Sequence, residues 1–165
     1  MKMNKSELRE VIAASKEDTW EVLFNQYGEI HIHNPLMLSS SYMHGSSRGE
    51  LGCERHCKFD EKLYLNEKIT EVDEKNYRLK IVATEHNLPF FKEMSAVYEL
   101  SSVGTGMTEV KMTSYNTTSP RFMIYLMRGT QVKTLAKHLF GMKYYIETGK
   151  TVDNHNYSKI YKNYK

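Results

Sequence analysis

Residues 120–150, PRFMIYLMRGTQVKTLAKHLFGMKYYIETGK, carry the longest helical pattern in the chain. Placing one residue every 100° gathers most of their apolar side chains on one side, as in an amphipathic helix. That side consists of Val132, Leu135, Ala136, Leu139, Phe140, Met142 and Ile146, and Tyr125 continues it towards the start. The opposite side consists of Thr130, Lys133, Thr134, Lys137 and His138. An apolar band this wide is suited to lie on a sheet, so we expect the other elements to form one.

Proline and glycine mark the ends and two interior positions of this helix. Pro120 fits the first turn, where its missing N–H would have no partner in any case. Gly149 is a typical C-terminal stop. Gly129 and Gly141 lie inside the helix, where glycine is costly. Each of them therefore predicts a bend or a close approach to the sheet.

Two cations project within the apolar side of the helix, namely Arg128 and Lys143. Long basic side chains often cover apolar surface with their methylenes while the charge reaches water at the edge. The alternative is that the helix closes over a cavity and that one of the two cations faces into it.

The composition is that of an ordinary soluble globular domain. The chain has 165 residues, of which 40% are hydrophobic and 26% charged, and this is enough to bury a sizeable core. A formal net charge of +3 from scattered lysines does not indicate a nucleic-acid partner. We find no signal-like apolar segment near the start and no stretch that is apolar for long enough to cross a bilayer. We therefore expect a cytoplasmic protein without a membrane span.

The two cysteines indicate neither a disulfide nor a metal site. Cys53 and Cys57 lie four residues apart in a strand-like segment, on one face but too far apart to bond easily. His56 points to the opposite face, and no second group of residues has metal-ligand spacing. We expect reduced thiols, no metal and no other cofactor.

The rest of the chain alternates short elements with turn-forming residues. We expect a first strand at 7–14, a short helix capped by Ser15 and ended by Gly28, and a second short helix or turn at 29–35. Residues 151–165 show no clean periodicity and are expected to form a polar tail. Six strands are expected between these segments and the long helix, at 38–46, 51–59, 63–73, 76–86, 91–101 and 107–118.

This order of elements predicts a single α+β domain over residues 1–150. A curved antiparallel sheet of about seven strands would wrap around the long C-terminal helix, with two short helices after the first strand. One helix cannot fill the space over so many strands, so we expect a cavity between sheet and helix. Its walls would be Leu51, Cys53, Leu65, Ile69, Leu79, Ile81, Leu135, Leu139 and Met142.

Two charged residues lie on otherwise apolar strand faces. Because side chains alternate along a strand, Arg55 shares its face with two cysteines, and Glu67 shares its face with Leu65 and Ile69. A tight turn that pairs Phe59 with Leu63 keeps apolar residues opposite one another and places Arg55 directly opposite Glu67. Two interpretations follow. The pair is either a buried salt bridge that only satisfies itself or a polar anchor for a ligand in the cavity.

Several short motifs occur along the chain in a recognisable order. They are Ile12-Ala13-Ala14-Ser15 with Glu17 and Trp20, Gly52-Cys53-Glu54-Arg55, Leu65-Asn66-Glu67-Lys68-Ile69 with Asp73-Glu74, Leu88-Pro89, and Gly104-Thr105-Gly106 with Thr108 and Val110. In this order they resemble the START-like superfamily called SRPBCC, which has the helix-grip fold, and especially its polyketide cyclase/dehydrase-like branch. The resemblance covers roughly residues 7–149. It departs at His31-Ile32-His33-Asn34-Pro35, where the family often has a tryptophan before the proline.

The resemblance implies a helix-grip domain that binds a small, largely hydrophobic ligand, such as a lipid, an isoprenoid or a polyketide-like compound. In related plant hormone receptors the residues equivalent to Glu67 face the ligand cavity. The superfamily also contains lipid carriers, cyclases and dioxygenase subunits, so a polyketide cyclase or dehydratase is the alternative. In that case His33 or Glu67 would act as general base and Arg55 would polarise a carbonyl group.

The remaining candidates are the two histidines before Pro35. His31 and His33 are either solvated in a loop or face the mouth of the cavity, where a near-neutral pKa suits acid–base chemistry. A third class, a protein-interaction module, would show an exposed apolar patch instead of a closed pocket. The candidate ligand-binding residues are Arg55, Glu67, His31, His33, Lys143, Leu65, Ile69 and Leu139, and no catalytic residue is assigned.

Overall fold

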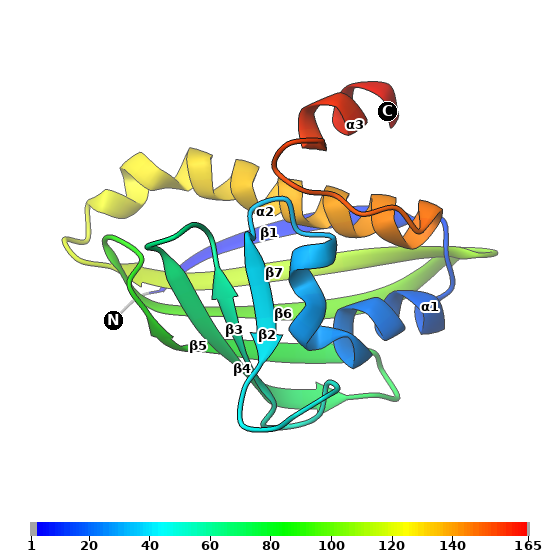
Figure 1. The fold of residues 1–165 in the computed structure, drawn as a ribbon, viewed down its shortest axis with the longest axis horizontal. Helices are drawn as coiled ribbons and strands as arrows, with labels where there is room; N and C mark the ends of the chain where they lie inside the picture. Colours follow the sequence, from blue (N-terminus) through cyan, green and yellow to red (C-terminus); the bar gives the residue numbers. More distant parts are fainter. Residues whose placement is uncertain (1–2, 165) are drawn as a thin grey trace.

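The computed structural model describes residues 3–164, which form one sheet with helices on it (Figure 1). The first elements are β1 (Asn4–Ile12), α1 (Lys16–Trp20), a π-helical turn η1 (Glu21–Asn25) and a 3-10 helix η2 (Tyr27–Ile32). Six strands follow: β2 (Ser39–Tyr42), β3 (Glu54–Lys58), β4 (Tyr64–Asp73), β5 (Arg78–His86), β6 (Phe91–Gly104) and β7 (Met107–Thr118). The chain then forms the long helix α2 (Met123–Thr148) and a shorter helix α3 (Tyr157–Tyr164).

The sheet has seven strands in the order β1-β7-β6-β5-β4-β3-β2, and all neighbours are antiparallel. Figure 1 shows α2 along one face of the curved sheet, with α1 at the end where α2 terminates. The predicted α+β fold is therefore confirmed. The main difference lies around β2, which ends at Tyr42 instead of 46, while β3 begins only at Glu54. The segment between them turns through His44, Gly45 and Gly52, whose positive φ angles do not continue a strand.

The first helix begins at the expected serine cap. The backbone N–H of Asp18 donates to Ser15 Oγ at 3.0 Å, and the Ser15 hydroxyl donates to the Asp18 carboxylate at 2.9 Å. This cap satisfies one of the free N–H groups of α1. The helix and the turn after it then bring Trp20, Leu23 and Phe24 into the core.

Helix α2 is buried along its second half. It ends as predicted at Gly149, which has a left-handed φ of 71° and donates its N–H to the Tyr145 carbonyl at 2.8 Å. Its buried residues are His138, Leu139, Phe140, Gly141 and Met142. Two predictions about its faces are wrong, because Tyr125 is 82% exposed and His138, expected on the polar side, is buried. The core cluster reaches back along α2 only to Leu135 among the described residues, so the earlier apolar side chains contact no core.

The C-terminal segment is helical where we expected a polar tail. Rings of Tyr157, Tyr161 and Tyr164 lie 5.8, 4.9 and 6.2 Å from the Phe140 ring in edge-on arrangements. Edge-to-face aromatic contacts of this kind stabilise packing beyond the area they bury. Helix α3 is therefore attached to the outer side of α2 (Figure 1).

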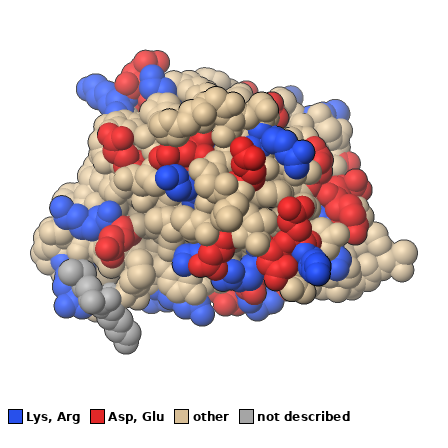
Figure 2. All heavy atoms as spheres, turned by 90° about the horizontal axis from the view of Figure 1, so that it is seen from below, with Lys and Arg blue, Asp and Glu red and all other residues tan. Residues whose placement is uncertain are grey.

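The outer surface carries charges of both signs. In the view of Figure 2, Lys and Arg side chains alternate with Asp and Glu side chains. Ion pairs of the sheet include Arg78 with Glu71 at 2.8 Å and Lys80 with Glu71 at 2.9 Å. A mixed surface of this kind produces no broad positive field on that face.

Gly141 lies where α2 comes closest to the segment after η2. A Cβ atom at this position would lie 2.1 Å from the His33 carbonyl oxygen and 2.9 Å from Pro35 Cδ. Gly141 therefore marks a close approach, but to this loop and not to the sheet as predicted. At Gly129 a Cβ atom would meet nothing within 4 Å, so the close approach predicted there is wrong.

The two glycines form a matched pair for a stability test. Gly129→Ala is expected to raise the free energy of unfolding by about 0.5–1 kcal/mol, because alanine favours the helix and meets no neighbour. Gly141→Ala is expected to lower it by about 1–3 kcal/mol, because the methyl group overlaps backbone atoms of the loop. Urea unfolding of both variants measures the difference. Equal effects at the two positions would contradict the tight contact at Gly141.

Candidate functional site: a cavity between sheet and helix

A cavity of about 280 Å³ lies between the sheet and α2. Its lining is mostly apolar and comes from η2 and the segment after it, from β3, β4, β6 and β7 with the turns between them, and from α2. Prominent lining residues are Met37, Leu65, Phe91, Met94, Met112 and Leu135. A concave, mostly apolar cavity with a few polar groups is typical of small-molecule sites.

The polar part of the cavity centres on Arg55 and Glu67. The two residues are direct partners in the β3–β4 pairing, and the Phe59 N–H donates to the Leu63 carbonyl at 2.9 Å. The predicted register is therefore confirmed. Both side chains line the cavity.

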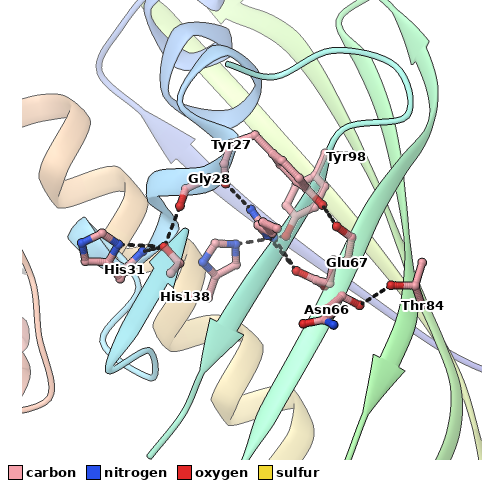
Figure 3. Close-up of polar contacts among 10 residues, drawn as sticks. Tyr27, Gly28, His31, Asn66, Glu67, Thr84, Tyr98 and His138 are labelled. Atoms are coloured by element: carbon pink, nitrogen blue, oxygen red, sulfur yellow. Dashed lines mark hydrogen bonds and ion pairs between the residues drawn. The ribbon is translucent and has the colours of Figure 1, made fainter. Parts of the chain in front are cut away.

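Arg55 is held on three sides. Its Nε and Nη2 donate to the same oxygen of Glu67, Oε2, at 2.9 and 2.6 Å, and its Nη1 donates to the Tyr27 carbonyl at 2.8 Å. The guanidinium also lies 4.0 Å from the centre of the Tyr27 ring, and the Tyr27 hydroxyl donates to the Glu67 carbonyl at 3.0 Å (Figure 3). Burial disfavours the charge, but the surrounding groups, Tyr27 first and Glu67 next, raise the pKa of Arg55 overall.

Only one oxygen of the Glu67 carboxylate accepts hydrogen bonds from Arg55. Both hydrogen bonds from Arg55 reach Oε2, and Oε1 accepts none from residues 3–164. The side chain is 14% exposed, against 5% for that of Arg55. Arg55 is therefore an internal partner, while one oxygen of Glu67 is available to a polar group in the cavity.

A second polar group on the cavity wall is the pair Tyr98 and His138. The Tyr98 oxygen lies 3.0 Å from His138 Nε2, and Figure 3 shows the two side chains pointing toward one another. The His33 ring stacks on His138 with centroids 6.0 Å apart and on Tyr145 at 5.8 Å. The Nδ1 atoms of His33 and His138 are buried and have no hydrogen-bond partner within the described chain.

Burial keeps both histidines neutral. It lowers the pKa of His138 to about 3, with a further contribution from the Arg55 charge. Burial also places the pKa of His33 well below the ordinary value, assisted by His138 and Arg55. Neutral imidazoles in this position can give or accept hydrogen bonds but do not carry charge at pH 7.

Comparison with known proteins finds similarity in structure but not in sequence. No protein-family model and no curated protein matches the chain. The crystal structure of Ara h 8.0201 superposes with a TM-score of 0.70 at 13% identity, covering 88% of this chain and 98% of that chain. A Nitrosospira multiformis protein solved by a structural genomics consortium superposes with a TM-score of 0.66 at 15% identity, with the same coverage. This is the helix-grip fold. Identities this low show a common fold and leave the function to be argued from the site.

The helix-grip fold brings some of the predicted site residues together and separates others. Arg55, Glu67 and Leu65 line the cavity. Ile69 and Leu139 are buried in the core behind it, 0% and 1% exposed. The predicted wall residue Leu51 is 67% exposed, because it lies in the turn before β3 and not on the strand.

The three other predicted polar contacts, Lys143, His31 and His33, lie outside the cavity lining. Lys143 donates to the Val11 carbonyl and to Glu147 Oε1, the latter at 2.9 Å, and so ties α2 to β1. His31 Nδ1 lies 2.7 Å from Ser40 Oγ, which in turn donates to the Gly28 carbonyl. His33 borders a separate void of about 10 Å³ behind Arg55 and His138.

His138, Tyr98 and Gln131 line the cavity but were not predicted as site residues. A signal for His138 was present, because a residue three positions after Leu135 lies only about 60° from it around a helix. Tyr98 lies on the inward face of β6, where a tyrosine is easily taken for a core residue. Gln131 lies three residues before Thr134, slightly less than one helical turn, and both residues line the cavity.

The described residues offer no obvious metal centre or membrane span. No three of their His, Cys, Asp and Glu side chains are grouped so that they could hold a metal ion. Cys53 and Cys57 are both buried free thiols. Among residues 3–164, no helix is both long enough and apolar enough to cross a membrane.

The buried ion pair can be tested by a double-mutant cycle. Arg55→Met and Glu67→Leu are each expected to lower the free energy of unfolding by about 3–5 kcal/mol, because each leaves an unpaired buried charge. The double variant should cost much less than the sum of the two. The exposed pair Arg78 and Glu71 is the control, and the same cycle there should give a coupling of about 0–1 kcal/mol. Additive costs at Arg55 and Glu67 would show that they are not coupled.

The two buried histidines predict a loss of stability in mild acid. Below pH 6.5 the unfolded chain binds protons that the folded chain excludes. The free energy of unfolding is therefore highest above pH 6.5 and decreases as the pH falls towards the folded-state pKa of His138, about 3. His138 contributes a loss of about 1.4 kcal/mol of unfolding free energy per pH unit, or about 2 kcal/mol at pH 5, and His33 acts in the same direction. Urea unfolding at pH 7.5 and pH 5 measures it.

Replacement of one histidine isolates its contribution to this loss. His138→Gln is expected to reduce the difference in unfolding free energy between the two pH values. His155→Gln, which changes an exposed histidine, is expected to leave that difference as in the wild type. The same pH dependence in both variants would contradict a neutral, buried His138.

Proposed function

We propose that this protein binds a small, largely apolar molecule in the cavity between the sheet and α2. The observation that carries the proposal is the cavity itself, about 280 Å³ in volume and lined mainly by side chains such as Met94, Met112 and Leu135. Filling such a space with apolar side chains would stabilise the fold, since voids forfeit packing contacts. A cavity that persists despite this cost is well suited to a ligand.

The polar groups on the wall support a ligand that also carries a polar group. Gln131 Oε1 and His138 Nδ1 are buried without partners within the described chain, and Glu67 Oε1 accepts no hydrogen bond there. All three residues line the same cavity. Buried polar atoms nearly always have a partner. A ligand hydroxyl can donate to Gln131 Oε1 or Glu67 Oε1, whereas a ligand carbonyl can only accept, from a protonated Nδ1 of His138. Lipids, isoprenoids and polyketide-like compounds all meet this description.

Of the candidate contacts, Arg55, Glu67 and Leu65 are retained in the proposed site. Arg55 orients Glu67, and Glu67 presents its second oxygen to the ligand. Ile69, Leu139 and His33 support the site from the layer behind the wall. The cyclase or dehydratase alternative is not favoured. Of its two expected bases, His33 borders a different void, and Glu67 is already paired with the guanidinium of Arg55.

Blocking the cavity tests the proposal. Thr134 lines the cavity from α2, whereas Ala136 on the same helix is exposed. Thr134→Trp is expected to weaken binding of the neutral fluorescent probe N-phenyl-1-naphthylamine at least tenfold, and Ala136→Trp is expected to stay within twofold of the wild type. A fluorescence titration measures both, and mass spectrometry of purified protein identifies any retained ligand. A wild type that binds no probe, or equal binding by the two variants, would refute the proposal.

A further inference from the structure

A second hollow lies at the start of α2. It has a volume of about 480 Å³ and is bordered by the start of β1, the end of β7 and the first turns of α2. Figure 1 shows these three segments together at the end of the molecule where the chain begins. Its lining includes Asn4, Asn116, Arg121, Ile124, Tyr125 and Arg128.

The floor of this hollow is formed by buried polar groups. Asn4 and Asn116 are direct partners in the β1–β7 pairing, and Asn116 is 0% exposed. Both amide atoms of Asn116, the Nδ2 atom of Asn4 and the hydroxyl of the neighbouring Ser6 have no hydrogen-bond partner within the described chain. Buried amides are almost always paired, and an unpaired one is costly. Of these residues, Asn4 and Asn116 line the hollow, and their Nδ2 atoms are suited to donate to an acceptor from outside the described chain.

The hollow is also positively charged. Arg121 and Arg128 line it, and neither forms an ion pair with a carboxylate in residues 3–164. None of the lining residues is acidic. The sequence explains this, because it contains no Asp or Glu between Glu109 and Glu147. Amide donors beside unpaired guanidinium groups are a typical environment for a carboxylate or phosphate oxygen.

The hollow and the cavity are neighbours along the seam between β7 and α2. Asn116 follows Ser114 on the same face of β7, and Ser114 lines the cavity. On α2, Arg128 of the hollow lies about one turn before Gln131 of the cavity. The buried, unpartnered Oε1 atom of Gln131 lies at this junction.

We propose that the hollow at Asn116 binds the oxyanion end of an amphipathic ligand, a carboxylate or a phosphate monoester, whose hydrocarbon part occupies the cavity. Asn116 and Asn4 donate hydrogen bonds from their amide groups to the oxyanion. Arg121 and Arg128 supply the opposite charge. This inference rests on the proposed function, and it specifies the ligand class as a hydrocarbon chain with an acidic end.

The test compares three ligands with the same chain, namely dodecanoate, dodecyl phosphate and dodecanol, below their micellar concentrations. Each is used to displace N-phenyl-1-naphthylamine from the full-length protein. The wild type is expected to bind at least one of the two acidic ligands ten times or more tightly than the alcohol. The comparison of dodecanoate with dodecyl phosphate identifies which oxyanion the hollow prefers.

Variants test whether the hollow is the cause of the preference for acidic ligands over dodecanol. Asn116→Leu and Arg128→Gln are each expected to reduce the preference for acidic ligands to less than threefold, because each removes one partner of the oxyanion. Lys133→Gln is the matched control, since it removes one cation from an exposed position of the same helix and should retain the preference. Arg128 is exposed, so its variant serves the test even if Asn116→Leu does not fold.

The outcomes separate this inference from the proposed function. If the neutral probe and dodecanol bind but the acidic ligands gain nothing, the oxyanion site is refuted and the cavity proposal stands. A preference that survives both Asn116→Leu and Arg128→Gln refutes the site at Asn116. If neither the probe nor dodecanol binds, the cavity proposal itself fails, and the inference fails with it.

Discussion

A single helix has to cover a seven-stranded curved sheet, and this constraint shapes the rest of the molecule. Helix α2 meets it with its second half, where His138–Met142 are buried and Gly141 allows contact with the segment after η2. The first half does not reach the core. Space therefore remains beneath the middle and the start of the helix, and both hollows follow from that geometry. The fold itself produces the room for a ligand.

The polar groups inside this space are arranged in two different ways. Arg55 is surrounded by partners, with Glu67 and the Tyr27 carbonyl taking its hydrogen bonds, and so it behaves as a structural residue. Gln131, His138 and Asn116 instead keep buried atoms that have no partner among residues 3–164. The first arrangement stabilises the native sheet only modestly, because desolvation offsets much of the attraction. The second lowers stability, and a binding role would account for its presence.

The pairing of β3 with β4 could be predicted because the inward residues Arg55, Cys57, Leu65, Glu67 and Ile69 alternate with polar residues along the two strands. Shifting the register by one residue would have put both charges in solvent and the apolar residues with them. The helix faces were harder to predict, since an apolar band extrapolated from Leu139 and Met142 continues to Tyr125 whether or not a surface lies beneath it. Which part of α2 meets the core depends on where strands distant in sequence lie beneath it, and no local pattern reports that.

Two features that were not predicted, helix α3 and the polar end of β7, are indicated by local sequence patterns. Tyr157, Tyr161 and Tyr164 repeat at helical spacing, and this pattern gave evidence for α3 despite the polar composition around it. In β7, Ser114 and Asn116 continue the inward face after Met112 and make it polar. A strand whose inward face changes from apolar to polar along its length indicates a site that changes in the same direction.

Because of this change in polarity, the two ends of the space beneath α2 differ in chemical character. The wall is apolar around Met112 and Leu135, mixed at Ser114 and Gln131, and cationic at Arg121 and Arg128. An oxyanion placed at the inner end would lie beside the Glu67 carboxylate, where the charge of Arg55 is already matched, and like charges repel strongly in a buried site. At the Asn116 end it would meet unpaired guanidinium groups and free amide donors. Electrostatics therefore favours one orientation for an amphipathic ligand, with its hydrocarbon part inward and its acidic end towards the start of α2.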